Sequence, residues 1–526
     1  MIYKDYINMS LKLESEDIMI RLAKTENGFV KGIEAADPRI TAFKGIPFAA
    51  PPIGENRWRA PQPCPDWEGT LEAYRFKPIG MQDTPGLGTD IYCREWHVDP
   101  DIPMSEDCLY LNVWTNAKSV DEKLPVMVWY FGGGLQWGYT SEMEFDGERI
   151  ARRGVVVVTV NYRLNAFGFL AHPELTANQS EAPTNFGHLD QVAGLKWVIR
   201  NIEAFGGDPN NITIAGQSAG GGSVLSILTS PNCSGLFQKA IIQSAMINSP
   251  YNDMKVSFIQ SLSEAEQNGI NFFEYMGVKN LEEARKLDPI YVRNKYSEFY
   301  KINRMMTTVI DEKYCVGVPL SLMMQNKHAK VPILSGITSD EFLNSIMADS
   351  DEEFLEKAKE IFGPHSEEFL SYKEAWNKNG NSYGTMSGLE CTIKSVFLQH
   401  QRNKNNDKCF YYCFDTDIPG WDNPGNFHSV ELWFTFETLA KCWRPFTGKH
   451  YDLARQMCNY WCNFVKNGDP NGKDADGSEM PYWSPYTKES PYGMVFAADG
   501  PYLDKNEDSE FKKFMIDRIT ENLSKQ

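Results

Sequence analysis

The sequence predicts an α/β protein with a mostly parallel central sheet and helices on both of its faces. Short β-branched runs recur along the chain, and helical stretches separate them. Several runs are apolar on both faces, as strands buried in a parallel sheet are. This alternation of strands and helices is typical of a doubly wound α/β fold. The strands that we expect are 125–130, 155–160, 212–215, 240–243, 331–337, 409–414 and 494–497.

Helical stretches complete this architecture and indicate one domain over residues 1–526. The stretch 189–204 is expected to be the crossover helix before the strand at 212–215. Residues from about 251 to 326 are helical and loop-like, and we expect them to form an insertion that covers the site. Near the end of the chain, Phe511, Phe514, Met515 and Ile519 fall at helical spacing. They predict a closing helix that packs on the core.

Composition narrows the class of protein further. The chain has 526 residues, of which 42% are hydrophobic and 23% are charged, so it can bury a large core. A formal net charge of −18 argues against a groove for nucleic acid. No apolar run reaches membrane-spanning length, and residues 1–22 carry charges throughout, unlike a secretion signal. We therefore expect a cytoplasmic protein that contacts neither nucleic acid nor membrane.

The cysteines predict neither a disulfide framework nor a metal site. Their number, eleven, is odd, and they are scattered along the chain. Cys458 and Cys462 share a helix face, but no histidine or acidic residue lies near them at the spacing of metal ligands. Packing in the core is the better interpretation for this pair. We expect no metal and no cofactor.

One short motif after a predicted strand indicates a catalytic serine. Residues 216–220 read Gly-Gln-Ser-Ala-Gly, and the helix-compatible stretch 222–228 follows them directly. The flanking glycines let the backbone turn sharply and let helix and strand pack closely. A strand, G-x-S-x-G and a helix in this order form the nucleophile elbow of α/β-hydrolases. We therefore predict that Ser218 is the nucleophile.

The acid partner of Ser218 is expected at the carboxyl edge of the same sheet. In α/β-hydrolases the serine comes first along the chain, then the acid, then the histidine. The predicted strand 331–337 is followed by Thr-Ser-Asp-Glu at 338–341. Asp340 and Glu341 are both candidates, and position along the strand does not choose between them.

The base is expected in a loop at the same edge. Four histidines follow the candidate acids, namely His365, His400, His428 and His450. His400 lies in a helical pattern, His365 follows a Gly-Pro turn, and His450 precedes a helix. Only His428 lies in a loop that leaves the carboxyl end of a strand, 409–414. Position and order therefore select His428.

A triple glycine supplies the candidate oxyanion hole. Residues 132–134 are all glycine and follow the predicted strand 125–130. Glycine lets backbone N–H groups approach a substrate carbonyl closely, and esterases place such a loop after a strand upstream of the elbow. Ala219, directly after the serine, is expected to supply a further donor.

Several longer motifs in the chain match one known family. They are FKGIPFA at 43–49, SEDCLYLN at 105–112, NYR at 161–163, NFGHLDQ at 185–191 and FGGDP at 205–209. With the elbow, they make the chain resemble the type-B carboxylesterases from about Gly28 to Glu510. That family includes cholinesterases, juvenile hormone esterases and bacterial para-nitrobenzyl esterases, and the chain looks like a bacterial-type member.

The resemblance implies an α/β-hydrolase fold with helical insertions over the active site and assigns the site residues. It places the triad acid at Glu341 and the histidine at His428, and it places the oxyanion donors at Gly133, Gly134 and Ala219. It also implies two structural ion pairs, Arg57 with Glu106 and Arg163 with Asp190.

The chain departs from the secreted members of that family at one cysteine. In those members the cysteine that matches Cys108 is bridged to an upstream cysteine, and an ungapped count places Met81 there. Cys93 is the alternative partner. Reduced thiols in an intracellular enzyme are the simplest interpretation.

It departs from the cholinesterases as well. Those enzymes carry a glutamate before the nucleophile and an upstream tryptophan that holds quaternary ammonium. This chain has Gln217, and an ungapped count places Val98 at the tryptophan position, with Trp96 out of register. A choline ester is therefore not expected. The acyl pocket is expected around Tyr251 and 302–306.

We expect a serine esterase that cleaves small soluble carboxylic esters through an acyl-enzyme, with an ester substrate and water as its partners. A non-catalytic adhesion or scaffold module on the same fold is an alternative, as in neuroligin-like proteins. It is disfavoured because Ser218, Glu341 and His428 are all present. A lipase, amidase or feruloyl-type preference also stays open, although no lipid-facing amphipathic lid is evident.

Overall fold

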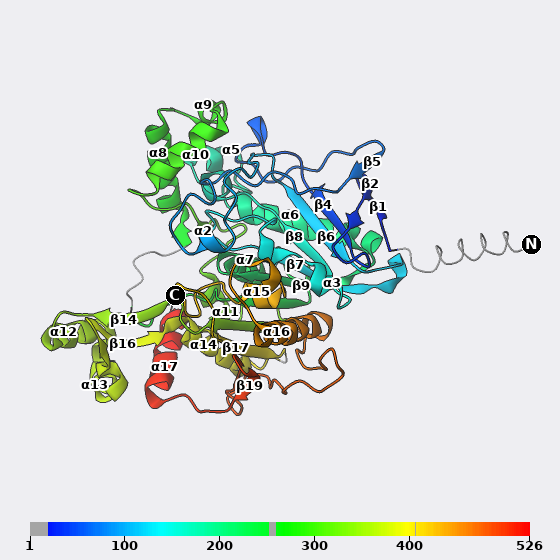
Figure 1. Cartoon of the computed structure of the whole chain (residues 1–526). Coiled ribbons are helices and arrows are strands. Elements are labelled where there is room, and N and C mark those ends of the chain that lie inside the picture. The colour runs from blue at the N-terminus through cyan, green and yellow to red at the C-terminus, as the bar shows by residue number, and fades with distance from the viewer. Residues whose placement is uncertain (1–18, 252–258, 406, 526) are drawn as a thin grey trace, which may run out of the picture.

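A large sheet of eleven strands lies at the centre of the computed structural model, which describes residues 19–251, 259–405 and 407–525 (Figure 1). From one edge to the other the strands are β19 (Gly500–Asp504), β18 (Gly493–Ala497), β17 (Cys409–Asp415), β13 (Ile333–Thr338), β10 (Lys239–Gln243), β9 (Gly207–Gln217), β7 (Leu124–Tyr130), β8 (Val156–Val160), β6 (Tyr110–Thr115), β4 (Thr41–Pro47) and β3 (Ile33–Glu34).

The sheet is mostly parallel, as predicted. All neighbouring pairs from β18 to β8 run parallel. The antiparallel pairs lie toward the two edges, where β19 joins β18 and where β6, β4 and β3 extend the other side. Each of the seven expected strands is present, with ends that differ by a few residues; β9 is the longest because it begins at Gly207.

Alternate residues of the central strands pack into two different cores, one on each face of the sheet. In β7, Val126 and Val128 belong to one hydrophobic cluster, and Met127 and Trp129 belong to the other. All four side chains are at most 1% exposed. Helices cover both faces (Figure 1). Burial on both faces explains why these strands read as continuous apolar runs in the sequence.

Helices connect the parallel strands and form two outer lobes. The helices are α2 (Tyr92–Glu95), α3 (Glu148–Ala151), α4 (Asn165–Phe169), α5 (Pro173–Asn178), α6 (Phe186–Asn201), α7 (Ala219–Thr229), α8 (Leu262–Met276), α9 (Leu281–Arg285), α10 (Pro289–Phe299), α11 (Pro319–Met324), α12 (Asp351–Phe362), α13 (Ser366–Ser371), α14 (Gly388–Arg402), α15 (Leu432–Thr435), α16 (Gly448–Asn467) and α17 (Glu510–Lys525).

Short elements complete the fold. Three small sheets contain β1 (Leu22–Thr25), β2 (Gly28–Lys31) and β5 (Thr70–Glu72); β11 (Ile259–Ser261) and β12 (Thr308–Ile310); and β14 (Leu343–Met347), β16 (Ser382–Ser387) and β15 (Lys378–Asn379). The 3₁₀ turns are η1 (Gly54–Asn56), η2 (Val120–Glu122), η3 (Met143–Phe145), η4 (Ile202–Phe205), η5 (Gly363–His365), η6 (Lys373–Trp376) and η7 (Leu439–Lys441).

The expected helices are present with shifted ends. The crossover helix α6 begins at Phe186 and ends at Asn201, after which the chain tightens into η4. The closing helix α17 buries Phe511, Phe514, Met515 and Ile519 and lies beside α14. Among the described residues, no helix has both the length and the apolarity needed to cross a bilayer.

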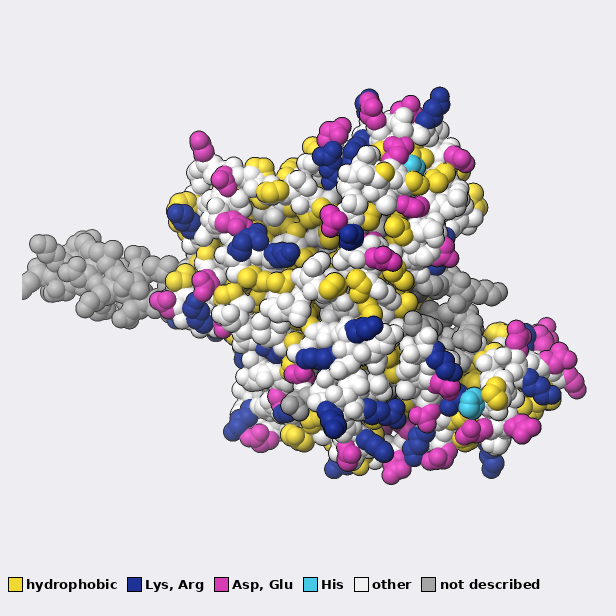
Figure 2. All heavy atoms as spheres, turned by 180° about the vertical axis from the view of Figure 1, so that it is seen from behind, with side chains coloured by type: hydrophobic (Ala, Val, Ile, Leu, Met, Phe, Trp, Pro, Cys, Tyr) yellow, Lys and Arg dark blue, Asp and Glu magenta, His cyan; other side chains and the backbone are white. Residues whose placement is uncertain are grey.

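Two lobes stand out from the sheet. One contains α8, α9 and α10, and the other contains α12 and α13 (Figure 1). The first lobe belongs to the segment from about 251 to 326, of which residues 252–258 lie outside the described part. Helix α12 begins with three carboxylates at Asp351–Glu353, and the Ser350 hydroxyl accepts a hydrogen bond from the Glu353 N–H at 3.2 Å. Figure 2 shows acidic side chains gathered over this second lobe.

All eleven cysteines are free thiols. Cys458 and Cys462 are both buried on α16, in agreement with a packing role in the core. Cys108 is buried as well, and burial raises the pKa of its thiol above the usual range.

Both ion pairs that the family resemblance implied are present and buried. The Arg57 guanidinium donates two hydrogen bonds of 2.6 Å to the two carboxylate oxygens of Glu106. Arg163 binds Asp190 in the same two-pronged way at 2.7 Å, and the Asp190 side chain has no exposed surface. Burial raises the pKa of Asp190, and the contact with Arg163 opposes that rise. The ionised form of the buried Asp190 carboxylate is therefore stabilised by its contact with Arg163.

Replacing Arg163 with methionine should strongly destabilise the fold, because it leaves the Asp190 carboxylate buried and unpaired. We expect a loss of about 3–5 kcal/mol in the free energy of unfolding, measured by urea denaturation. The matched control is Lys286→Met, which breaks the exposed pair with Glu282 and should change stability by less than about 1 kcal/mol. Equal effects of the two substitutions would contradict this account.

Candidate active site

Ser218 lies on a sharp turn between β9 and α7. Its backbone has φ 54° and ψ −128°, which is unusual for a residue with a side chain. Its N–H donates to the Gln243 carbonyl of the neighbouring strand at 2.9 Å. The flanking glycines are needed here, because a Cβ on Gly220 would lie 2.0 Å from the Tyr130 carbonyl oxygen. The turn has the geometry of a nucleophile elbow.

Glu341 and His428 meet at the carboxyl edge of two neighbouring parallel strands. Glu341 follows β13, and His428 lies in the loop after β17. The His428 Nδ1 and the Glu341 Oε2 form a short hydrogen bond, although 87 residues separate them in the sequence. The other carboxylate oxygen of Glu341 accepts the Thr338 N–H at 2.9 Å. The Glu341 side chain is fully buried, and that of His428 is 13% exposed.

Asp340, the other candidate acid, points to the backbone of the same loop. Its carboxylate accepts the Asn426 N–H at 2.7 Å. Asn426 lies two residues before His428, and its own side-chain oxygen accepts the Thr416 N–H at 3.1 Å. The two neighbouring carboxylates thus contact different parts of one loop: Glu341 contacts the imidazole, and Asp340 holds the chain that carries it.

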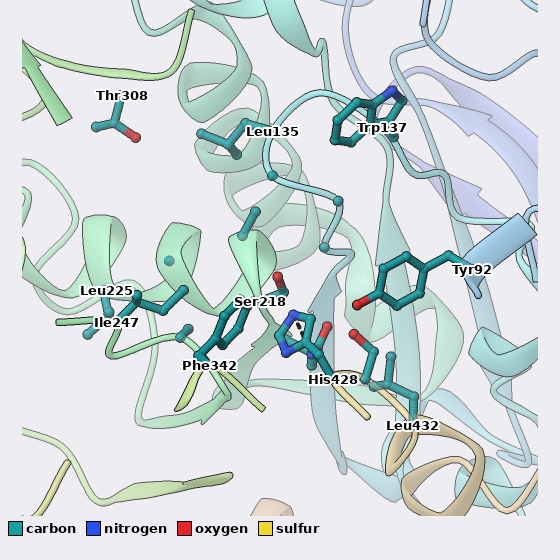
Figure 3. Close-up of a pocket in the computed structure, with 18 of the residues that line it drawn as sticks. Tyr92, Leu135, Trp137, Ser218, Leu225, Ile247, Thr308, Phe342, His428 and Leu432 are labelled. Carbon is teal, nitrogen blue, oxygen red and sulfur yellow. Dashed lines mark hydrogen bonds between the residues drawn. The ribbon is translucent and has the colours of Figure 1, made fainter. Parts of the chain in front are cut away.

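The second imidazole nitrogen of His428 faces the turn that carries Ser218. The carboxylate at Nδ1 favours the tautomer with its proton on that nitrogen, which leaves Nε2 as an acceptor. The Gln217 side-chain nitrogen lies 3.3 Å from this Nε2. Figure 3 shows Ser218 next to His428 on the wall of one cavity. Phe342 covers the imidazole from the other side, with the two ring centres 4.5 Å apart.

The candidate oxyanion donors border the same cavity. Gly133 and Gly134 have φ values of 96° and 63°, and a Cβ on Gly133 would lie 2.3 Å from the Trp137 carbonyl oxygen. The Gly133 carbonyl accepts the N–H groups of Gln136 and Trp137, which closes the turn. Gly133, Gly134 and Ala219 all line the cavity beside Ser218. Within the described part of the chain, the N–H groups of Gly133 and Gly134 have no acceptor.

The cavity itself has a volume of about 1030 Å³. Figure 3 shows Leu225, Ile247 and Phe342 on one side of Ser218, and Tyr92 and Trp137 on the other. Such a volume suits a small-molecule ligand, and the mixture of apolar and polar walls is usual for ligand sites. Residues from the segment 251–326 contribute to it, namely Ile259, Tyr300, Thr308, Val318, Pro319 and Leu320.

The structure shows which of the residues named from the sequence for this pocket line the cavity. Trp96 lines it, whereas Val98 is 44% exposed and is not among the lining residues. Tyr251 is also not on the wall, since its hydroxyl donates to the Gly384 carbonyl, and Ile302 is 76% exposed. Tyr300 and Thr308 take the places expected for Tyr251 and 302–306.

A second carboxyl group close to Glu341 and His428 was not found by sequence reasoning. Glu431 lies three residues after His428 and is fully buried. Burial and the charge of Glu341 raise its pKa to about 8. Its Oε1 accepts a hydrogen bond from the Gln243 side chain at 3.4 Å, and its Oε2 has no partner among the described residues. Only the His-x-x-Glu spacing could have indicated it, and that spacing by itself is unspecific.

Two further glutamates on the cavity wall were also missed. The Glu142 carboxylate accepts the Tyr139 N–H at 2.8 Å and contacts the His97 Nε2 at 3.2 Å. Glu144 is fully buried, and burial together with the charge of Glu142 raises its pKa well above the ordinary value. Their sequence, Ser-Glu-Met-Glu, resembles any solvated turn, so only the fold reveals that they face a cavity.

Comparison with known proteins identifies the family. The model of the carboxylesterase family matches residues 20–387 and 370–511. The chain is 31% identical to the fumonisin B1 esterase of Sphingopyxis macrogoltabida over 477 residues, which cover 85% of this chain and 82% of that protein. It is 30% identical to carboxylesterase 4A of Bos taurus over 516 residues, or 90% of each chain.

Solved structures agree with this assignment. A carboxylesterase of Geobacillus stearothermophilus, EST55, superposes with a TM-score of 0.72 at 28% identity, covering 94% of this chain and 99% of its own. A PNB esterase superposes with a TM-score of 0.74 at 27% identity, covering 95% and 100%. The fold is therefore the α/β-hydrolase fold of these esterases. The chain belongs to the carboxylesterase family and is a carboxylic-ester hydrolase.

Proposed function

We propose that this esterase works through an acyl-enzyme formed on Ser218, with His428 as base and Glu341 as the acid of the triad. His428 Nε2 takes the hydroxyl proton while Ser218 Oγ attacks the ester carbonyl. Glu341 holds the imidazole tautomer and stabilises the imidazolium. The observation that carries this proposal is the Glu341–His428 hydrogen bond directly beside the Ser218 turn.

The oxyanion is assigned to three backbone donors, the N–H groups of Gly133, Gly134 and Ala219. All three residues line the cavity beside Ser218, which supports this assignment, and one such donor typically changes the rate by about 10²–10³. His428 then gives its proton to the leaving alcohol. A water molecule repeats the attack on the acyl-enzyme, with His428 again as base, and releases the carboxylic acid and free Ser218.

The contact between Gln217 and His428 must break before His428 can take the Ser218 proton. In the free enzyme the amide of Gln217 occupies the lone pair of Nε2. The Ser218 hydroxyl must replace it there before proton transfer, which requires only a side-chain rotation. Catalytic hydrogen bonds are often formed fully only once substrate is bound.

The cavity supports a small-molecule ester as substrate, and we propose that segment 251–326 shapes its outer wall through Tyr300, Thr308 and Leu320. Eleven free thiols favour a reducing compartment such as the cytoplasm. The lipase, amidase and feruloyl-type alternatives differ from this proposal only in the ester or amide accepted, so a substrate panel separates them. A scaffold role would make Ser218, Glu341 and His428 dispensable.

The triad acid can be tested with the two neighbouring carboxylates that the sequence left as alternatives. Glu341→Gln keeps the shape of the side chain but removes the charge that holds the His428 tautomer. We expect kcat to fall by about 10³–10⁴ on a short acyl ester. Asp340→Asn is the matched control. It weakens one backbone contact of the loop, and we expect a fall of less than about tenfold. Larger damage from Asp340→Asn would reverse the assignment.

Glu431 should make the stability of the protein depend on pH. Its pKa is about 8 in the folded protein and near the ordinary 4.5 in the unfolded chain. Between these values the folded state binds the extra proton, so the contribution of this group to stability falls as pH rises and is lost above about pH 8.

Glu431→Gln imitates the neutral carboxyl at every pH. Urea denaturation at about pH 5, 7 and 9 should therefore show the variant gaining stability relative to the natural chain as pH rises. Glu352→Gln, on the exposed start of α12, serves as control and should show no such trend. A constant difference between the Glu431 variant and the natural chain would mean that Glu431 is ionised in the folded protein.

A further inference from the structure

The cavity beside Ser218 has one acidic wall. Asp83, Asp90, Glu142 and Glu144 all line it. Asp83 accepts the Tyr300 hydroxyl at 3.0 Å, and the Tyr300 ring contacts Trp137. Asp90 accepts the Cys93 N–H at 3.1 Å in α2, the helix that carries Tyr92. Asp83 and Asp90 therefore lie on the side of Ser218 where Figure 3 shows Tyr92 and Trp137.

The opposite side of the cavity is apolar. Leu225, Ile247 and Phe342 bound it in Figure 3, and Leu320 also lines the cavity. Among the described lining residues, four are carboxylic acids, and no lysine or arginine occurs. His97 contacts Glu142 at 3.2 Å and neutralises at most one of the four. The cavity is thus apolar at one end and negative at the other.

Glu144 is the most informative of the four acids. It is fully buried, and neither of its carboxylate oxygens accepts a hydrogen bond from any described residue. Glu142, its neighbour on the same wall, is 6% exposed. Two adjacent buried carboxyl groups repel each other when both are ionised, and His97 contacts only Glu142. A positive group of a substrate placed beside Glu144 would supply the partner that this carboxyl group lacks.

We propose that this carboxylate wall, defined as Asp83, Asp90, Glu142 and Glu144, selects esters that carry a protonated amine. The inference rests on the proposed function, since it concerns the substrate of the same Ser218 site. The ammonium group lies against the carboxylate wall, the apolar half of the ester lies toward Ile247 and Phe342, and the ester carbonyl lies between them at Ser218.

The chemistry of the wall favours an ammonium group with N–H bonds. Carboxylate oxygens accept charge-assisted hydrogen bonds, which are about twice as strong as neutral ones. A quaternary ammonium has no N–H and gains only the Coulomb attraction. The wall therefore favours a protonated amine over a quaternary ammonium of similar size. This agrees with Gln217 in this chain, since the cholinesterases have a glutamate at that position.

The net charge of −18 adds a long-range contribution. A negative protein attracts a cationic substrate to a cleft of the same sign and raises its rate of association, and salt weakens this attraction. A neutral ester of the same shape is insensitive to both effects. The dependence on salt can be measured in the natural chain without any substitution.

The experiment compares esters of matched shape at neutral pH. In one set, dimethylaminoethyl butyrate carries the ammonium, isoamyl butyrate is its neutral isostere, and butyrylcholine is its quaternary analogue. In a second set the amine is on the acyl side, as ethyl dimethylaminobutyrate against its carbon isostere. The ratio of kcat/KM for the ammonium ester to that for its isostere is the readout, and the two sets show which half of the ester meets the wall.

We expect a ratio of about ten or more in at least one set, falling as salt is raised, and a lower kcat/KM for butyrylcholine than for the ammonium ester. In Asp90→Asn/Glu142→Gln the ratio should fall toward one. Glu352→Gln, an exposed carboxylate on α12, should leave it unchanged. Because each ratio is internal to one variant, a general loss of activity does not affect it.

A ratio near or below one in both sets, or a ratio that the double variant does not change, would overturn the inference. A preference for butyrylcholine over the ammonium ester would also overturn it, because N–H recognition would then be absent. Failure to hydrolyse any of these esters, the neutral ones included, would instead contradict the proposed acyl-enzyme mechanism.

Discussion

The parallel order of β9, β10, β13 and β17 is the constraint on which the candidate active site depends. Parallel strands end at the same edge of a sheet, so the residues that follow β9, β13 and β17 meet there, however far apart they are in sequence. The two cores on the faces of the sheet hold these strands in register. A shift of one residue in β13 would displace the loop that carries Glu341 relative to the loop that carries His428.

Burial affects which carboxyl groups near this edge of the sheet hold a proton. Glu341 is fully buried and accepts hydrogen bonds from the Thr338 N–H and the His428 imidazole, whereas Glu431 has one long hydrogen bond, from Gln243, and a raised pKa. One ionised and one protonated carboxyl group can share a small volume, whereas two ionised groups repel each other. The same principle applies to Glu142 and Glu144 on the carboxylate wall. Burial thus favours one protonated carboxyl group in each of these two pairs.

Much of this arrangement could be predicted from the sequence, and the failures have physical reasons. The strands were predictable because burial on both faces leaves continuous apolar runs, and Ser218 was predictable because its turn requires glycine at fixed positions. Strand position could not choose between Asp340 and Glu341, because the direction of a side chain after a strand depends on the loop, and only the family resemblance assigned Glu341. Glu142 and Glu144 were missed because the path of a loop, and not its composition, brings them to the cavity.

The most direct test of the central claim is covalent labelling of Ser218. A fluorophosphonate should form one bond from phosphorus to the Ser218 oxygen, with loss of fluoride, and intact-mass measurement should show one adduct per chain. Peptide mapping should place the adduct on Ser218, and Ser218→Ala should take up none while keeping its fold. Labelling at another residue, or equal labelling of Ser218→Ala, would contradict the account.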